Sequence, residues 1–441
     1  MKKYLKKLKH IDKDLVDLVR GGGINFIFYG LNLAIVYFLA IIITKYYGSA
    51  AYGRYSIIKS LILVLIILNT LGLNTYAIKL AAHKNHFENG FFKSDFLKKS
   101  YFILIFTSII FTIVLFFFKR EIAIVIFKDE NLEVYLIYFP VILLFSVFLN
   151  YNSNVLKGQG KILSFSVISS FLNNFIFIIL LILIFNWYSK SELFLVISLL
   201  ISFLIAFIVS AFNIFPLRFS KERITFKYSD LIKESFPMML SSSMIFIIFS
   251  VDILMLGYFD TSENVGIYRI VTQISGLNAV FLIIFSAIVG PKIANLFSDG
   301  RNLEIEPLIK KSSKIILFIT FPILILILVF SKEILLFFGT DYLAATKAII
   351  ILSICQFIYA ISGFVDLILN MTGNQKIFGR ITVLTAVLNI VLNLFLIPKY
   401  GITGAAISTG FSILLTNALG IIYIHKKYKF LPFYIPFTKI K

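Results

Sequence analysis

Cysteine and histidine are nearly absent from this sequence, which has one cysteine, Cys355, and four histidines in 441 residues. A disulfide bond within the chain is therefore excluded, and so is a metal site with several cysteine ligands. The sequence also lacks a phosphate-binding P-loop, a nucleophile elbow and a zinc-protease helix. We therefore expect neither ATP hydrolysis by this chain nor a resident metal or organic cofactor.

Charged residues are also scarce. Aspartate, glutamate, lysine and arginine make up 15% of the chain, whereas soluble globular domains carry about 25%. Apolar residues make up 59%, and apolar runs of roughly 20 residues, long enough to cross a bilayer as a helix, recur from end to end. The loops between these runs are short, and the longest on the outer side, residues 119–134, is itself half apolar. A membrane-bound glycosyltransferase, ligase or polymerase usually needs a larger loop, so that class is disfavoured.

These runs predict an all-α integral membrane protein with twelve transmembrane helices. Two of the spans, 315–330 and 381–397, are short and need their flanking residues to complete a crossing. Six spans on each side of a linker at 216–235 give an N-terminal bundle, residues 21–215, and a C-terminal bundle, residues 236–424. The predicted spans are residues 24–43, 57–80, 101–118, 135–156, 162–185, 193–215, 236–258, 270–289, 315–330, 348–369, 381–397 and 402–424.

The net charge is +20, but the lysines and arginines lie mainly in loops between spans, which does not favour a nucleic-acid partner. With the N-terminus placed inside, most of them fall on the inner side. This bias is the positive-inside signature, and it places both termini in the cytoplasm. Residues 1–20 carry leucines at helical spacing with lysines between them, which predicts an amphipathic helix on the inner membrane surface or a solvated basic segment. Residues 425–441 form a basic cytoplasmic tail.

The two halves of the chain repeat the same short motifs. Gly53, in Tyr-Gly-Arg-Tyr, corresponds to Gly266, in Val-Gly-Ile-Tyr. Gly158, in Lys-Gly-Gln-Gly-Lys, corresponds to Gly373, in Thr-Gly-Asn-Gln-Lys, at nearly the same spacing along the chain. Because six spans return each half to the same side, the two bundles are parallel repeats related by an axis along the membrane normal. We expect a path for a transported molecule between them.

Four cations at or just inside span ends are candidates for binding an anionic substrate: Arg54, Lys59, Lys157 and Arg269. A guanidinium can bind phosphate through two hydrogen bonds, while an ammonium acts as a movable point charge. Lys59 and Arg269 are favoured because both follow the repeated Gly-x-Tyr motif, which puts two cations near the outer mouth. The alternative for each cation is a side chain that snorkels to the membrane surface.

Two acids inside spans are candidates for binding a coupling proton or sodium ion, because ionisable groups in a bilayer are costly and usually face the bundle interior. Asp252 lies six residues before the outer end of its span, which is roughly 9 Å deep. It contacts a headgroup or a coupling ion, or it is a structural partner of Arg269. Asp366, near the inner end of its span, faces the lumen or pairs with a loop lysine.

Asparagines inside the spans form a second polar set, in which Asn174, Asn389 and Asn393 are candidate substrate contacts. Asn174 and Asn389 have the same spacing as the second glycine pair, and Asn389 and Asn393 share one helix face because they are four residues apart. Amides in a bilayer need partners, so they bind sugar hydroxyls or tie neighbouring helices together. We favour the second role.

The order of several short motifs resembles a known family. Together the motifs resemble the Wzx-type polysaccharide flippases of the multidrug/oligosaccharidyl-lipid/polysaccharide exporter superfamily over nearly the whole chain, and this resemblance implies a V-shaped pair of six-helix bundles. The motifs are Arg-Gly-Gly at 20–22, Tyr-Gly-Arg-Tyr-Ser at 52–56, Leu-Lys-Gly-Gln-Gly-Lys at 156–161, Asp252 to Gly257, Val-Gly-Ile-Tyr at 265–268 and Ile-Pro-Lys-Tyr-Gly-Ile-Thr-Gly-Ala-Ala at 397–406.

The resemblance also implies a function. It implies transfer of an undecaprenyl-diphosphate-linked oligosaccharide across the bacterial cytoplasmic membrane by alternating access, for O-antigen, capsule or a similar surface polysaccharide. Membrane lipids, a polysaccharide polymerase and glycosyltransferases would be its partners, and the family's basic central cavity fits the roles given to the four cations. The alternative is an ion-coupled multidrug antiporter of the same superfamily. Those exporters commonly carry an acid in the first span, and residues 24–43 contain none.

Overall fold

The computed structural model describes residues 13–82, 94–185, 191–214 and 226–434. These residues form helices joined by short turns, with no β-strand among them, which confirms the predicted all-α class. The helices of the N-terminal half are α2 (Lys13–Thr70), α3 (Leu73–Ala82), α4 (Ser94–Phe117), α5 (Lys119–Glu121), η3 (Ile122–Ile126), α6 (Leu132–Gly158), α7 (Ile162–Ser166), η4 (Val167–Leu172), α8 (Asn173–Phe185) and α9 (Glu192–Ile214).

The C-terminal half begins with α10, whose first residue, Tyr228, lies within the predicted linker. Its helices are α10 (Tyr228–Phe259), α11 (Ser262–Ser298), η5 (Asn302–Glu304), α12 (Ile305–Val329), α13 (Ser331–Leu336), η6 (Thr340–Ala345), α14 (Thr346–Ile361), α15 (Val365–Met371) and α16 (Gln375–Tyr428).

The number of membrane crossings agrees with the twelve predicted. Within the described residues, nine helical segments are long and apolar enough to cross a bilayer. Two of these nine, in α2 and α16, make two crossings each, because Gly48 and Gly401 adopt non-helical backbone angles and turn the chain. The 32-residue α10 supplies the remaining crossing.

Several boundaries differ from the predicted spans. The second crossing is interrupted at Leu71 and Gly72, which both have positive φ, and α3 continues it. The tenth is interrupted at Gly363 and Phe364, again with positive φ. Residues 13–20, which were predicted to belong to a separate surface helix, form the start of α2. Residues 1–12 of the predicted surface helix, 215–225 of the linker and 435–441 of the tail lie outside the described residues.

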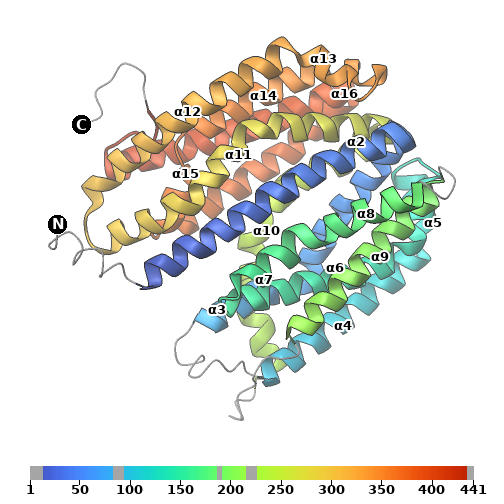
Figure 1. Ribbon diagram of the computed structural model, residues 1–441, viewed down its shortest axis with the longest axis horizontal. Coiled ribbons are helices and arrows are strands. Elements are labelled where there is room, and N and C mark those ends of the chain that lie inside the picture. Colours follow the sequence, from blue (N-terminus) through green and yellow to red (C-terminus); the bar gives the residue numbers. More distant parts are fainter. Residues whose placement is uncertain (1–12, 83–93, 186–190, 215–225, 435–441) are drawn as a thin grey trace.

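The two halves form a V, as Figure 1 shows. They converge at what we call the narrow end, which carries the Gly48 turn, residues 127–131 and the turn between α10 and α11. They diverge toward the wide end, where α2 begins and where the turns at 299–301 and 372–374 and residues 429–434 lie (Figure 1).

Two repeat-related glycines bring the halves together at the narrow end. A Cβ atom on Gly53 would lie 1.6 Å from the carbonyl oxygen of Ser262, and one on Gly266 would lie 2.1 Å from the carbonyl oxygen of Ser49. The two contacts are reciprocal, since Ser49 and Ser262 have the same spacing along the chain as the two glycines. The part of α2 that follows the Gly48 turn and the start of α11 therefore cross at backbone contact distance, which only glycine permits.

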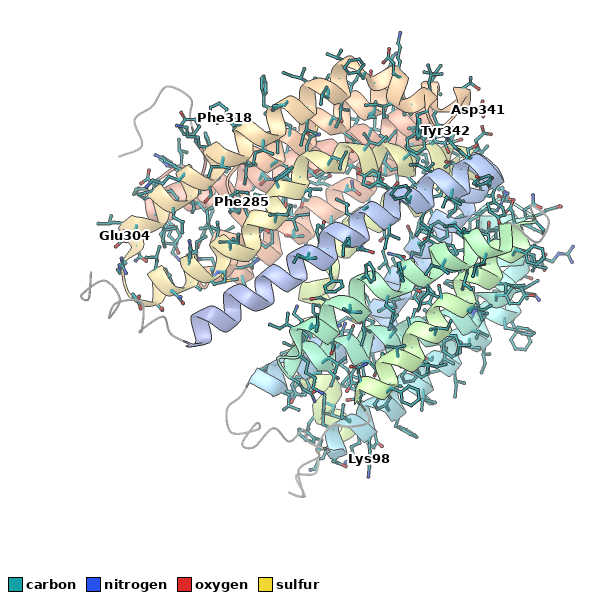
Figure 2. All side chains as sticks on the ribbon, viewed as in Figure 1. Lys98, Phe285, Glu304, Phe318, Asp341 and Tyr342 are labelled. Atoms are coloured by element: carbon teal, nitrogen blue, oxygen red, sulfur yellow. The ribbon has the colours of Figure 1, made fainter. Side chains whose placement is uncertain are left out.

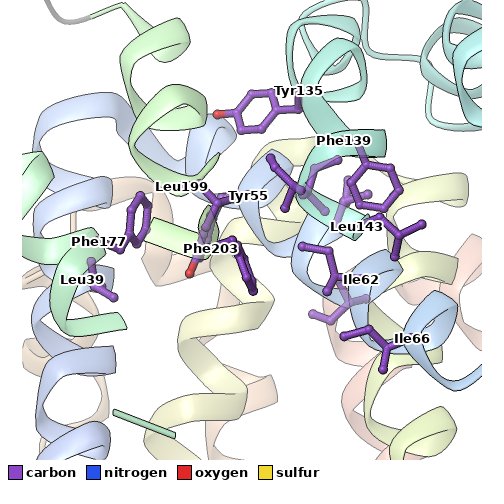
Figure 3. Packing of buried hydrophobic residues seen from close by; sticks show 14 of the residues in the cluster. Leu39, Tyr55, Ile62, Ile66, Tyr135, Phe139, Leu143, Phe177, Leu199 and Phe203 are labelled. Atoms are coloured by element: carbon purple, nitrogen blue, oxygen red, sulfur yellow. The ribbon is translucent and has the colours of Figure 1, made fainter. Parts of the chain in front are cut away.

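Apolar side chains cover the outside of both halves and also fill their interiors. In Figure 2, Phe318 points away from the C-terminal half, whereas Lys98, Glu304 and Asp341 lie at the ends of helices. This is the distribution that a bilayer imposes. Inside the N-terminal half, Tyr55 of α2 packs beside Phe177 of α8 with stacked rings 5.6 Å apart (Figure 3).

Candidate functional site

A cavity of about 560 Å³ lies at the seam between the two halves, where the sequence predicts a path. The first segment of α2 forms one wall of this seam cavity, and α10, α11, α14 and α16 form the other. Its polar lining residues are Tyr29, Asn32, Tyr37, Asp252, Arg269, Thr272, Gln273, Ser275, Gln356, Tyr359 and Thr409.

Most of this lining comes from one face of each of two helices. On α11 the lining positions include 269, 272, 273, 276, 279, 280 and 283, and on α2 they are 29, 32, 33, 36 and 37. Spacings of three and four residues define one helix face. Of the residues on these two faces, only Arg269 was predicted from the sequence as a site residue. The signal that was missed is the recurrence of tyrosine, asparagine, threonine and glutamine at this spacing within apolar helices.

Arg269 is the only lysine or arginine among the described residues that line the seam cavity. None of the ion pairs in the described part of the chain involves it. Next to it, Tyr37 donates a hydrogen bond to the backbone oxygen of Gln273 at 2.6 Å, and Tyr52 donates to Oε1 of Gln273 at 3.1 Å. A positive charge without a counter-charge is costly away from bulk water, so this part of the cavity favours an anionic group.

Asp252 is an acid of the seam cavity, and its side chain is 2% exposed. Oδ1 accepts a hydrogen bond from Nδ2 of Asn393 at 2.7 Å. Oδ2 accepts hydrogen bonds from the hydroxyls of Tyr268, at 3.3 Å, and Thr409. Among the described residues Asp252 makes no ion pair with Arg269, the structural partner considered above. Its contacts are instead neutral side chains of α11 and α16.

Asn389 and Asn393 complete this polar cluster, and both are fully buried. Nδ2 of Asn393 donates to Oδ1 of Asn389 at 3.1 Å as well as to Asp252, so the pair ties α16 to α10. Nδ2 of Asn389 and Oδ1 of Asn393 have no hydrogen-bond partner among the described residues. Buried polar atoms without a partner are rare, so the cluster retains binding capacity beside the carboxylate.

Asp366 lies in a second cavity, of about 120 Å³, within the C-terminal half. Its polar lining residues are Gln356, Tyr359, Asp366, Thr382, Ser412, Thr416 and Asn417. None of the ion pairs among the described residues includes Asp366, so the pairing with a loop lysine is not seen there. Gln356 and Tyr359 line both cavities, so the Asp366 cavity adjoins the seam cavity.

Arg54 lies outside both cavities, in an ion cluster at the narrow end. Its guanidinium binds Asp129 at 2.8 Å and both carboxylate oxygens of Glu192. Tyr135 donates a hydrogen bond to Glu192 at 2.9 Å, and Ser262 of the C-terminal half donates to Asp129 at 2.6 Å. Two carboxylates thus neutralise Arg54, and the cluster joins the two halves beside the glycine contact.

The remaining predicted residues also lie outside the lining of both cavities. Lys59 has its Nζ 5.3 Å from the centre of the Phe203 ring, and no described carboxylate pairs with it. Lys157, which is exposed, has its Nζ 5.0 Å from the centre of the Phe165 ring. Nδ2 of Asn174 donates to Oδ1 of Asn32 at 2.8 Å, which ties α8 to the wall of the seam cavity.

Two protein families match this sequence. Residues 18–297 match the family described as "Polysaccharide biosynthesis protein", and residues 237–395 match the family MatE. The first match covers more than half of the chain and agrees with the resemblance seen in the sequence motifs.

Several curated proteins are similar to parts of this chain. The probable low-salt glycan biosynthesis flippase Agl15 of Haloferax volcanii is 30% identical over 177 residues, 39% of this chain and 37% of that protein. The uncharacterized membrane protein MJ1068 of Methanocaldococcus jannaschii is 30% identical over 297 residues, 62% of this chain and 56% of that protein. The capsular polysaccharide biosynthesis protein CapF of Staphylococcus aureus is 28% identical over 147 residues, 33% of this chain and 37% of that protein. The matched segments therefore span between 37% and 56% of these relatives.

Solved structures share the fold at low sequence identity. The inward closed conformation of the lipid II flippase MurJ superposes with a TM-score of 0.73 at 18% identity, covering 92% of this chain and 87% of that chain. The inward-facing conformation of a multidrug resistance MATE family transporter gives a TM-score of 0.71 at 14% identity, covering 92% and 94%. These likenesses confirm the two-bundle membrane fold.

Proposed function

The chain belongs to the polysaccharide biosynthesis protein family, and we propose that it is a flippase for a lipid-linked oligosaccharide rather than an enzyme. The finer proposal is an undecaprenyl-diphosphate carrier in a bacterial cytoplasmic membrane, with the oligosaccharide destined for O-antigen, capsule or a similar polymer. The wide end, which carries the described ends nearest both termini, would face the cytoplasm. Glycosyltransferases would supply the substrate, and a polymerase would use it.

The observation that carries this proposal is the seam cavity, where Arg269 has no carboxylate partner among the described residues and most of the other polar lining groups are neutral. The acid that lines the cavity, Asp252, is hydrogen-bonded to neutral side chains. Arg269 is placed to bind a phosphate of the headgroup. Tyrosine, asparagine, glutamine and threonine side chains around it can bind sugar hydroxyls. The lipid tail would stay in the bilayer while the headgroup crosses through this cavity, where fixed polar groups replace its water.

Alternating access follows from the V shape. The halves cross at the narrow end and diverge toward the wide end, where the start of α10 still contacts α3 through Gly72 and Ser235. The headgroup would enter the seam cavity from the wide side, beside the start of α2. Rocking of the halves would then separate the contact of Gly53 with Ser262 and open the narrow end. Parallel repeats that move as rigid bodies around a central site are a common transporter design.

A coupling cation would make net transport possible against a gradient, and we place its site at Asp252. The carboxylate, the hydroxyls of Tyr268 and Thr409 and the free Oδ1 of Asn393 are oxygen ligands of the kind that hard cations prefer. A proton on the carboxylate would serve the same purpose. Asp366 is a second acid available for this task.

Reconstitution tests this proposal. Purified protein in vesicles that contain a fluorescent lipid-linked oligosaccharide should expose inner-leaflet fluorophore to an impermeant quencher at a rate well above that of protein-free vesicles. Arg269→Gln should slow this transfer by about tenfold or more, since a charge-assisted hydrogen bond contributes about 1.5–3 kcal/mol. Arg301→Gln is the matched control, because Arg301 is exposed and pairs with Glu304 at 2.7 Å. Equal rates with and without protein would refute the proposal.

The second candidate function is an ion-coupled multidrug antiporter, which the match of residues 237–395 to the MatE family favours. Against it, the acid that such exporters commonly carry in the first span is missing, and Tyr37 lines the cavity there. Expression in a strain without its own exporters separates the two functions. Drug resistance that depends on Asp252, without any transfer of lipid-linked sugar, would establish the antiporter.

A further inference from the structure

A row of polar side chains runs through the C-terminal half between Asp366 and Asp252. Spacings of three and four residues put its first members on one face of α16. The part of α16 after Gly401 runs back alongside the first part and supplies the others. The members of this polar row are Thr382, Thr385, Asn389 and Asn393 before the turn, and Thr409, Ser412 and Thr416 after it.

Hydrogen bonds connect the row at both of its ends. Oγ1 of Thr416 donates to Oγ1 of Thr385 at 2.8 Å, and Thr416 lines the Asp366 cavity. At the other end, Asn393 bonds to Asn389 and to Asp252. The distance along α16 from Thr382 to Asn393 is about 16 Å, at about 1.5 Å per residue.

The N-terminal half carries fewer polar side chains at the corresponding positions. At the positions related to the row by the spacing of Gly158 and Gly373, Asn174 and Ser170 are polar, but the other five residues are apolar. Asp252 itself corresponds to Leu39 by the spacing of Gly53 and Gly266. The N-terminal half buries other polar side chains instead, such as Ser198 and Ser202, and the Ser202 hydroxyl donates to Oδ1 of Asn173 at 2.9 Å. What distinguishes the C-terminal half is therefore the acid at the end of the row, because an ionisable group in a bilayer is costly and usually functional. The five apolar counterparts are Val167, Ile178, Phe194, Ile197 and Ile201.

The middle of the row also has unused binding capacity. Asn393 is fully buried, and its Oδ1, which can accept a hydrogen bond from a proton carrier or ligate a cation, has no partner among the described residues. Next to this amide lies the carboxylate of Asp252, and the cavity at the far end contains a second carboxylate, Asp366. Hydroxyl and amide oxygens therefore lie between the two acids, and oxygen atoms are the ligands that a small hard cation prefers.

We propose that a small cation, a proton or a sodium ion, moves along this row between the Asp366 cavity and Asp252. The C-terminal half then contains a cation route that is distinct from the seam cavity, with Gln356 and Tyr359 as the partition that both cavities share. This inference rests on the proposed function, since it assumes transport coupled to a cation at Asp252. The cation would enter from the wide end at Asp366. It would then pass Thr385 and Thr416, whose hydroxyl oxygens lie 2.8 Å apart.

Gradient-driven transport in vesicles tests the route. The measured quantity is the ratio of the transfer rates of a fluorescent lipid-linked oligosaccharide with and without an imposed gradient, in separate arms for sodium and for protons. We expect Thr385→Val and Thr416→Val each to reduce this ratio by about tenfold in the arm that accelerates the wild type. Thr320→Val is the matched control, because Thr320 is a fully buried threonine of α12 whose hydroxyl donates to the backbone oxygen of Ile316 in its own helix. Variants that keep the wild-type ratio would overturn the route while leaving the flippase proposal intact.

Thiol labelling of single-cysteine variants tests the proposed cation route without a transport measurement. Since Cys355 is the only cysteine, Cys355→Ala gives a background for single-cysteine variants. Thr382→Cys and Ser412→Cys should react with a small cationic thiol reagent added on the wide-end side, and the coupling cation should slow this reaction. Thr320→Cys should not react. Absence of labelling at both row positions would overturn the route even if the protein proves not to transfer lipid-linked sugar.

Discussion

Replacing Gly53 with alanine tests the contact that holds the narrow end together. The new Cβ would lie 1.6 Å from the carbonyl oxygen of Ser262, whereas ordinary contact begins at 3.4 Å, so the two helices must move apart. The atom that the Cβ meets belongs to the backbone, so no rotamer change relieves the overlap. Overpacking of this kind costs about 1–3 kcal/mol, which shifts a two-state equilibrium by about fivefold to more than a hundredfold. We therefore expect Gly53→Ala to favour conformations that are open at the narrow end.

Access to the seam cavity from the narrow-end side measures this shift. A cysteine at Thr272, which lines the cavity, is introduced into the Cys355→Ala background, and an impermeant thiol reagent is added outside intact cells. Gly53→Ala should increase the labelling rate at position 272 by about tenfold. Gly30→Ala is the control, since Gly30 is also on α2 and a Cβ there meets nothing within 4 Å. Equal labelling of the two variants would refute the reasoning that the glycine contact closes this end.

Three further predictions concern other contacts of the structure. Glu192→Gln removes one of the two carboxylates of the narrow-end ion cluster and should destabilise the protein by about 3 kcal/mol, whereas Glu304→Gln, in an exposed pair, should leave the melting temperature unchanged. Asp252→Asn should abolish the stabilisation by the coupling cation, which for the wild type is about 2.7 kcal/mol at a hundred times its Kd, in melting curves recorded across sodium concentration and pH. Gly363→Ala would place a Cβ 1.3 Å from the carbonyl oxygen of Pro432 at φ +83°, so it should release residues 429–434 from α15 and speed their cleavage in limited proteolysis.

The fold could be predicted from the sequence because the bilayer imposes a simple rule. Apolar runs long enough to cross it are visible without any knowledge of packing, and the repeated glycines Gly53 and Gly266 lie where helices of the two halves cross. Helix interruptions were harder to predict. Gly48 and Gly401 each turn the chain between two helical segments without a loop of several residues. Leu71 adopts a positive φ although it is not glycine. Only the packing of neighbouring helices selects such conformations.

The candidate site was predictable only in part. Arg269 and Asp252 stood out because single charges in apolar helices are expensive, and both line the seam cavity. Arg54 looked equivalent in sequence, but Asp129 and Glu192, which are far away along the chain, neutralise it. Such distant partners follow from tertiary structure and leave no local pattern. A single neutral polar residue such as Gln273 costs little free energy in an apolar helix, so it does not stand out in the sequence.

Photo-crosslinking tests the central claim, that the headgroup of a lipid-linked oligosaccharide binds in the seam cavity beside Arg269. A polyprenyl-diphosphate-linked sugar with a photoreactive group near the phosphates is bound to the protein in vesicles and irradiated, and the adducts are mapped by mass spectrometry. We predict adducts on residues 29–37 of α2 and 269–283 of α11, with a strong reduction in Arg269→Gln. Adducts confined to lipid-facing residues of α4 and α12, unchanged in that variant, would contradict this claim.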